Sequence, residues 1–84
     1  MIIDHIGISI ENSEKSKAFY TQALAPLNIV LIMEAHGWCG FGKDGKPEFW
    51  FGEAPVKHPQ LHIAFSADSR SQVDAFYTAA MAAG

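Results

Sequence analysis

Two stretches of the sequence decide the expected fold: HIGISIENSEKSKAFYTQALAPL at residues 5–27 and HIAFSADSRSQVDAFYTAAMAAG at residues 62–84. Aligned without a gap, they share nine identical residues over the twenty-three positions from His5 to Leu27. The identities include the histidine that opens each stretch, His5 or His62, and the tetrapeptide AFYT that follows it. Such self-similarity indicates that one supersecondary unit occurs twice. We therefore expect a first unit and the opening half of a second.

Each stretch opens with a segment that is typical of a β-strand, over 2–10 and again over 61–67. Apolar and small or polar residues alternate with period two, and β-branched residues are frequent. The apolar faces are formed by Ile2, Ile6, Ile8 and Ile10 in the first segment and by Leu61, Ile63 and Phe65 in the second. The opposite faces hold His5, Gly7 and Ser9 in the first segment and His62, Ala64 and Ser66 in the second.

A helix is predicted after each of these strands. Asn12 or Ser13 can cap the first helix, Asp68 or Ser69 can cap the second, and Pro26 marks the end of the first. The apolar residues then recur at helical spacing, which predicts that each helix packs an aromatic stripe on the sheet. The stripes contain Phe19, Tyr20, Ala23 and Leu24, and Val73, Phe76, Tyr77, Ala80 and Met81. We expect replacement of Phe19 or Phe76 by Ala to cost about 3–5 kcal/mol.

Three further strands are predicted between the two repeats, over 28–36, 37–43 and 47–53, with a hairpin turn at DGK, residues 44–46. Residues 54–60 contain two prolines and are typical of a linker. The expected element order is β-α-β-β-β, a linker and β-α, which is an α+β fold. We divide the single domain into a first βαβββ module over 1–56 and a linker with the opening strand and helix of a second module over 57–84.

Composition and charge exclude several classes of protein. The 84 residues are 49% hydrophobic and carry a net charge of −3, without a cluster of Lys and Arg, so nucleic acid is not an expected partner. No apolar run reaches the length of a membrane span, and no signal peptide opens the chain. Cys39 is the single cysteine, so no intrachain disulfide can form. These features favour a cytoplasmic location.

The small-residue faces of the two repeated strands predict a ligand cavity. Small side chains beneath an imidazole leave room instead of filling a core. If the two units pack with pseudo-twofold symmetry, His5 and His62 converge, and two neutral imidazoles can form part of a metal site. Ser9 and Ser66 then line the space for a substrate. The alternative is that both histidines are structural residues inherited through the duplication.

The strand over 47–53 carries further candidates. It places Glu48, Trp50 and Gly52 on one face, where a carboxylate and an indole could serve as a ligand and a substrate wall. Alternatively this is an aromatic core strand with acidic ends, and the sequence does not decide which face points inward. We expect Cys39 to be a small buried hydrophobic residue. His36 and His58, beside Gly37 and Pro59, are expected in exposed turns without a function.

The whole chain resembles the glyoxalase / bleomycin resistance / extradiol dioxygenase superfamily, also called vicinal oxygen chelate proteins. The resemblance rests on DHIGISI at 4–10, SEKSKAFYTQALAPL at 13–27, KPEFWFGE at 46–53 and LHIAFSA at 61–67 with its helix. It implies a paired-module fold in which two βαβββ modules curve around a metal and substrate cavity. Members typically run to about 120 residues or more, so the second module is expected to be truncated, without three strands and a metal-binding glutamate.

The resemblance implies metal ligands at His5 and His62, and a further ligand near Glu48. The metal would be divalent Zn, Fe, Mn or Ni. The function implied is that of a metal-dependent enzyme, of lyase, isomerase or dioxygenase type, which chelates a small substrate through adjacent oxygens. The alternatives are a metal-free protein that sequesters a small molecule or drug, for which Trp38 and Trp50 could stack on a flat ligand, and an inactive truncated fragment. Because the second module leaves a strand edge unpaired, we expect a homodimer.

Overall fold

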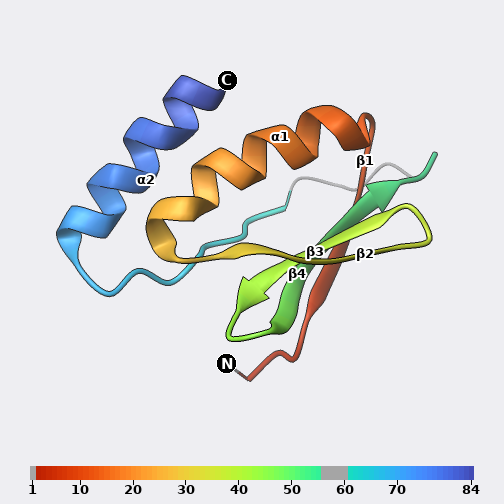
Figure 1. The fold of residues 1–84 in the computed structure, drawn as a ribbon, viewed down its shortest axis with the longest axis horizontal. Helices are drawn as coiled ribbons and strands as arrows, with labels where there is room; N and C mark the ends of the chain where they lie inside the picture. Colours follow the sequence, from red (N-terminus) through yellow and green to blue (C-terminus); the bar gives the residue numbers. More distant parts are fainter. Residues whose placement is uncertain (1, 56–60) are drawn as a thin grey trace.

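A computed structural model describes residues 2–55 and 61–84 of the chain (Figure 1). The elements follow the expected order as far as the second helix, with one exception described below. In chain order they are β1 (Ile6–Ile10), α1 (Ser13–Leu24), the short 3-10 helix η1 (Ala25–Leu27), β2 (Val30–Ala35), β3 (Trp38–Lys43), β4 (Lys46–Glu53) and α2 (Arg70–Ala83). No helix among these residues is long and apolar enough to span a membrane.

The four strands form one mixed sheet in the order β1-β4-β3-β2. β1 runs parallel to β4, whereas β3 is antiparallel to both β2 and β4. The two antiparallel connections are two-residue turns, His36–Gly37 and Asp44–Gly45, in which all four residues have positive φ. Such turns match the twist of the strands they join, and glycine adopts this conformation without steric cost. The turn predicted at 44–46 is confirmed, with Asp44 and Gly45 as its two connecting residues and Lys46 as the first residue of β4.

The predicted caps begin both helices. The Asn12 side-chain oxygen accepts a hydrogen bond from the Lys15 N–H at 3.1 Å, and the Ser69 hydroxyl accepts one from the Gln72 N–H at 3.2 Å. Each bond satisfies one of the free N–H groups in the first turn of a helix. After α1 the chain tightens into η1, which contains Pro26, and Asn28 then takes a left-handed conformation with φ 61°. This compact corner directs the chain into β2.

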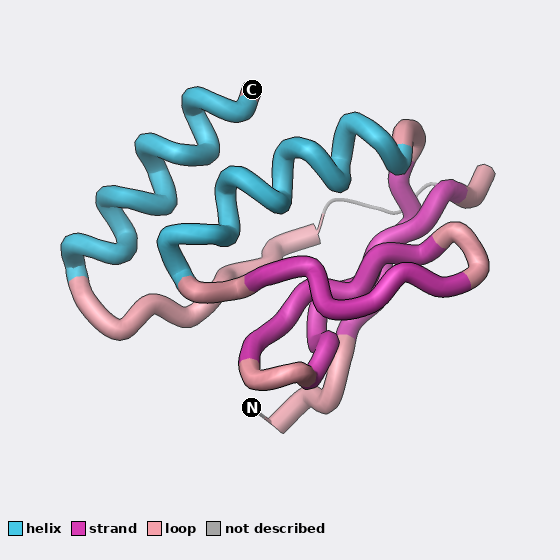
Figure 2. Tube along the Cα trace, viewed as in Figure 1, coloured by secondary structure: helices cyan, strands magenta, loops and turns pink. Residues whose placement is uncertain are grey.

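Both helices lie on one side of the sheet (Figures 1 and 2). The core lies between α1 and this face of the sheet, and α2 packs beside α1 and η1. Tyr20 is half-buried, and the centroid of its ring lies 5.0 Å from that of Phe49 and 5.3 Å from that of Phe51. The fully packed core consists of Ala23, Leu24, Leu27, Cys39, Phe41, Phe49 and Phe51. The predicted inward face is confirmed for Ile6, Ile8 and Ile10, which pack against this core. It is wrong for Ile2, which precedes β1 and is fully exposed.

The strand predicted over 61–67 is not formed. Residues 61–69 run as a loop, and no backbone group of 61–67 forms a hydrogen bond with the backbone of another described residue. The predicted alternation persists in the packing, because Ile63 and Phe65 turn to the core while His62 is exposed. The prediction was wrong because alternation fixes the direction of the side chains, whereas a strand also needs a hydrogen-bonded neighbour.

The aromatic stripes are only partly buried, which corrects the expected packing of the helices. Phe76 is half-buried and its ring lies 6.4 Å from that of Phe65. Phe19 is half-exposed and packs on Tyr20, outside the core cluster. On α2, Val73, Tyr77 and Met81 are 51%, 67% and 66% exposed, so this side of the stripe is only partly covered by the described residues. Because Phe76 packs against the core cluster and Phe19 does not, we now expect Phe19→Ala to lower the free energy of unfolding less than Phe76→Ala.

Candidate functional site

The sheet face that points away from the helices carries both tryptophans. The indole of Trp38 lies on Gly52, where an added Cβ would come within 2.5 Å of its ring carbons. The indole of Trp50 lies on Gly40 in the same way, with a corresponding distance of 2.9 Å. These are the cross-strand partners Trp38–Gly52 and Gly40–Trp50 of β3 and β4. Glycine at each position lets an indole lie against the backbone of the neighbouring strand.

The two indoles help to line a hollow of about 720 Å³ on this face. Such a volume lies within the range of small-molecule sites in proteins. The walls combine aromatic and apolar groups with several polar groups at one end. The lining residues are Asp4, His5, Gly7, Ala35, His36, Trp38, Lys46, Pro47 and Trp50.

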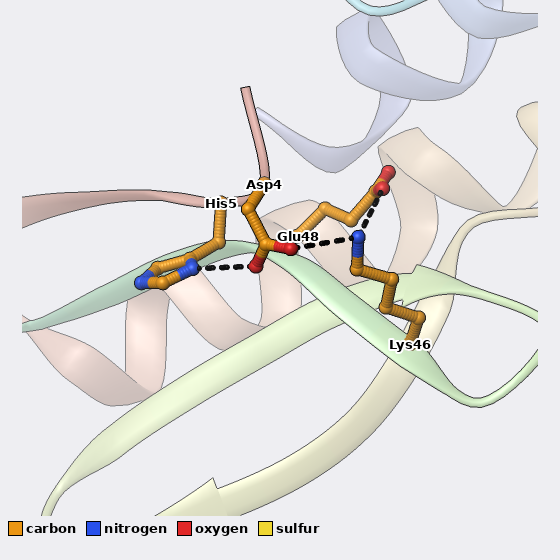
Figure 3. Close-up of polar contacts among 4 residues, drawn as sticks. All are labelled: Asp4, His5, Lys46 and Glu48. Atoms are coloured by element: carbon orange, nitrogen blue, oxygen red, sulfur yellow. Dashed lines mark hydrogen bonds and ion pairs between the residues drawn. The ribbon is translucent and has the colours of Figure 1, made fainter. Parts of the chain in front are cut away.

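Four polar side chains, joined by hydrogen bonds and ion pairs, connect the segment before β1 with the start of β4 (Figure 3). Asp4 Oδ1 lies 2.9 Å from His5 Nδ1, and Asp4 Oδ2 lies 3.1 Å from Lys46 Nζ. Lys46 also lies 3.6 Å from a carboxylate oxygen of Glu48. The hydrogen bonds from His5 and Lys46 hold the pKa of the Asp4 carboxyl below its ordinary value. The same bond, which Lys46 donates to the Asp4 carboxylate, raises the pKa of Lys46, so both groups stay charged near neutral pH.

The structure does not bring His5 and His62 together. His5 lines the hollow on the open face of the sheet, whereas His62 is exposed on the loop before α2 and does not line it. The physical reason is that the loop over 61–67 packs on the helix side of the core. Ser66 correspondingly lines a different cavity on that side, while Ser9 lies on β1 opposite Gly52.

Of the two candidates on β4, only Trp50 lies at the hollow. The β3–β4 register shifts between Phe41 and Gly42, so that Gly42 pairs with Pro47 and Glu48 becomes an extra residue in β4. This bulge turns Glu48 away from the face of Trp50, and Glu48 lines the cavity on the helix side of the sheet instead. The expected shared face of Glu48, Trp50 and Gly52 is therefore wrong for Glu48. Phe49 and Phe51 point into the core, which decides the question that the sequence left open.

His36 is a site residue that the sequence analysis missed. It occupies the exposed turn that was expected, with φ 52°, but its side chain also lines the hollow beside His5 and Trp38. The signal that could have found it is its position in a two-residue turn directly before the strand that carries Trp38. His58 lies outside the described residues.

The metal ligands available on this face are few. Among residues 2–55 and 61–84, no three His, Cys, Asp or Glu side chains gather closely enough to hold a metal ion. A catalytic metal site usually takes three protein ligands and keeps one position open. His5 and His36 could supply two imidazoles, so the donor set formed by the described residues is incomplete.

Cys39 has the structural role expected of it. Its side chain is 5% exposed in the core, and burial raises the pKa of the thiol above its ordinary value. A protonated, buried thiol is a weak nucleophile and a poor metal ligand. Cys39 therefore contributes packing and no chemistry to the candidate site.

The fold matches a solved structure over its whole length. A glyoxalase/bleomycin resistance protein from Albidiferax ferrireducens T118 superposes with a TM-score of 0.82 and 25% sequence identity. The match covers 100% of this chain and 71% of that chain. The chain belongs to the glyoxalase/bleomycin resistance protein superfamily. The α+β fold with an opening βαβββ module is thus confirmed for this superfamily member. No protein-family model matches the sequence, and no curated protein does so.

Proposed function

We propose that this member of the glyoxalase/bleomycin resistance superfamily binds a flat small molecule on the open face of its sheet. The observation that supports the proposal is the placement of Trp38 and Trp50 over glycines beside one hollow. An indole that lies on a glycine keeps its outer ring face accessible to a planar partner. Aromatic pairs of this kind contribute about 0.5–1.5 kcal/mol beyond the area that they bury.

Polar groups at one end of the hollow would orient such a ligand. His5, His36 and Lys46 offer hydrogen-bond donors, and Asp4 offers an acceptor. The Lys46 ammonium is already paired with Asp4, so the charge of this end is nearly balanced. We therefore expect a planar heteroaromatic or conjugated ligand that carries hydrogen-bonding groups along one edge.

Tryptophan fluorescence tests this proposal directly, because both tryptophans of the chain lie on the proposed face. We expect bleomycin, or another compound from a panel of planar heteroaromatics, to quench the emission with a saturable curve. Trp50→Leu should raise the Kd roughly 3- to 10-fold through the lost stacking.

The matched control for Trp50→Leu is Tyr77→Leu. It removes an exposed aromatic ring from α2, on the helix side of the sheet, and should leave the Kd unchanged. Quenching that is linear and equal in the wild type and Trp50→Leu would contradict a binding face formed by these tryptophans.

A metal-dependent enzyme is the second candidate function. It is favoured by His5 and His36, which place two imidazoles at the hollow, although the described residues supply no third ligand. A divalent metal completed by donors from elsewhere would supply Lewis-acid chemistry. Elemental analysis after purification without chelators separates the candidates. About one equivalent of Zn, Fe, Mn or Ni, lost in His5→Ala, supports the enzyme, and less than about a tenth supports the binding protein.

We also propose that the chain is a cytoplasmic homodimer. The support is the apolar surface on α2 and the adjoining loop, where Leu61, Val73, Tyr77 and Met81 are each about half or more exposed. Exposed apolar groups concentrated in one region often mark an interface. Light scattering should then give about twice the chain mass of 9.2 kDa. A concentration-independent mass near 9.2 kDa would refute the dimer.

A further inference from the structure

A second cavity lies on the helix side of the sheet, opposite the hollow that contains the tryptophans. It has a volume of about 270 Å³ and shares none of its lining residues with that hollow. Residues 63–66 of the loop line one side of it, and residues of β3 and β4 line the other. Its walls are mainly aromatic and branched aliphatic, with charged groups from the ends of β3 and β4. The apolar walls are Ile6, Ile29, Phe41, Phe49, Ile63 and Phe65.

The shape of the cavity suits an aromatic ring. Phe49 and Phe65 meet edge to face, with their ring centroids 5.1 Å apart and their planes at 90°. A third ring placed beside such a pair finds both ring faces and ring edges for favourable packing. An apolar protein cavity of about 150 Å³ is large enough to hold benzene. The volume here therefore accommodates a ring and a short side chain, on the order of ten non-hydrogen atoms.

Lys43 brings a positive charge to this apolar cavity. It lies at the end of β3 on the same face as Phe41, and its half-buried side chain lines the cavity. Lys43 forms no ion pair with any residue in the described part of the chain. Glu48 also lines the cavity, but its carboxylate already pairs with Lys46 at 3.6 Å. The cation that remains without a partner at the cavity is Lys43.

We propose that this cavity binds a small aromatic carboxylate, with the ring among the phenylalanines and the carboxylate on the Lys43 ammonium. The ligand buries its apolar part where the walls are apolar, and it pairs its charge with a cation that has no ion-pair partner among the described residues. A cationic ligand would meet the uncompensated charge of Lys43, so an amine is disfavoured. This site is separate from the open face and does not depend on what binds there.

The proposal is tested by amide NMR titration of the full chain with 3-phenylpropionate. We expect saturable shifts clustered at Phe41, Phe49 and Ile63. Lys43→Gln should raise the Kd about 5- to 10-fold, since a charge-assisted hydrogen bond is roughly twice as strong as a neutral one. Lys15→Gln is the matched control, because it removes the same charge from an exposed position of α1 and should leave the Kd unchanged.

A neutral analogue, 3-phenylpropanol, separates the charge contact from the apolar contact. It should bind the wild type more weakly than the carboxylate does, and should bind Lys43→Gln and the wild type equally. Equal effects of Lys43→Gln and Lys15→Gln on carboxylate binding would overturn the role of Lys43. Shifts confined to Trp38, Trp50 and Gly7, or the absence of saturable shifts at millimolar ligand, would overturn the site.

Discussion

Replacement of Phe41 by Ala is expected to lower the free energy of unfolding by about 3–5 kcal/mol. Phe41 is fully buried at the centre of the core, stacked at 5.7 Å on Phe51 and within 6.4 Å of the Tyr20 ring. A chain of this length has a total stability of roughly 4–13 kcal/mol, so the variant loses a large part of it. Urea unfolding followed by circular dichroism measures the change.

Two further variants make the measurement specific to packing. Phe41→Leu keeps most of the volume and should cost less than about 1.5 kcal/mol, which gives a readout if the Ala variant does not fold. Phe19→Ala removes the same ring from a half-exposed position outside the core and should cost about 1 kcal/mol. Equal losses for Phe41→Ala and Phe19→Ala would show that the core is not centred on Phe41.

Gly42→Ala is expected to destabilise the chain by about 3 kcal/mol or more, although it adds a single methyl group. A Cβ at this position would overlap the carbonyl oxygen of Lys46 on the paired strand. Because the obstacle is backbone, no side-chain movement can relieve it. The clash falls at the register shift between β3 and β4, so relief would require the bulge to open. Thermal unfolding measures the loss.

The control for this variant is Gly7→Ala on β1. An added Cβ there would meet Trp38 at 3.4 Å and Trp50 at 3.9 Å, which are ordinary contacts. We expect a change within about 1 kcal/mol, because Ala also has a lower backbone entropy cost than Gly. If both glycine variants unfold at the same temperature as the wild type, Gly42 does not approach the Lys46 backbone as closely as the structure shows.

Most of the first module could be predicted from local chemistry. The alternation in 6–10, the cap at Asn12 and the Asp44–Gly45 turn are each decided by a few neighbouring residues, and the structure confirms them. The part of the predicted strand over 2–5 is not formed. The bulge could not be predicted in this way, because it depends on how two strands are paired. It reverses the expected direction of Glu48 and so changes which residues meet at the open face.

The internal repeat correctly predicted which side chains of the two repeated segments point to the core. It did not predict where the second segment lies in the fold. His5 and His62 both point away from the core, as the shared alternation requires. However, β1 is paired with β4, whereas the second copy packs as a loop on the helix side of the core. Position within a fold is set by partners that lie far away in the sequence. The identity of the two histidines therefore did not place them in one site, and the turn residue His36 lines the hollow with His5 instead.

The parallel pairing of β1 with β4 has a consequence for the order of events during folding. The meander β2-β3-β4 is closed by two-residue turns, so its contacts are local and the entropy lost on closing its loops is small. β1 can add to this meander only after the chain brings Ile6 beside Phe49, across the whole of α1 and two strands. Non-local contacts of this kind slow folding. We therefore expect the meander to form first and the docking of β1 to limit the rate at which the open face is completed.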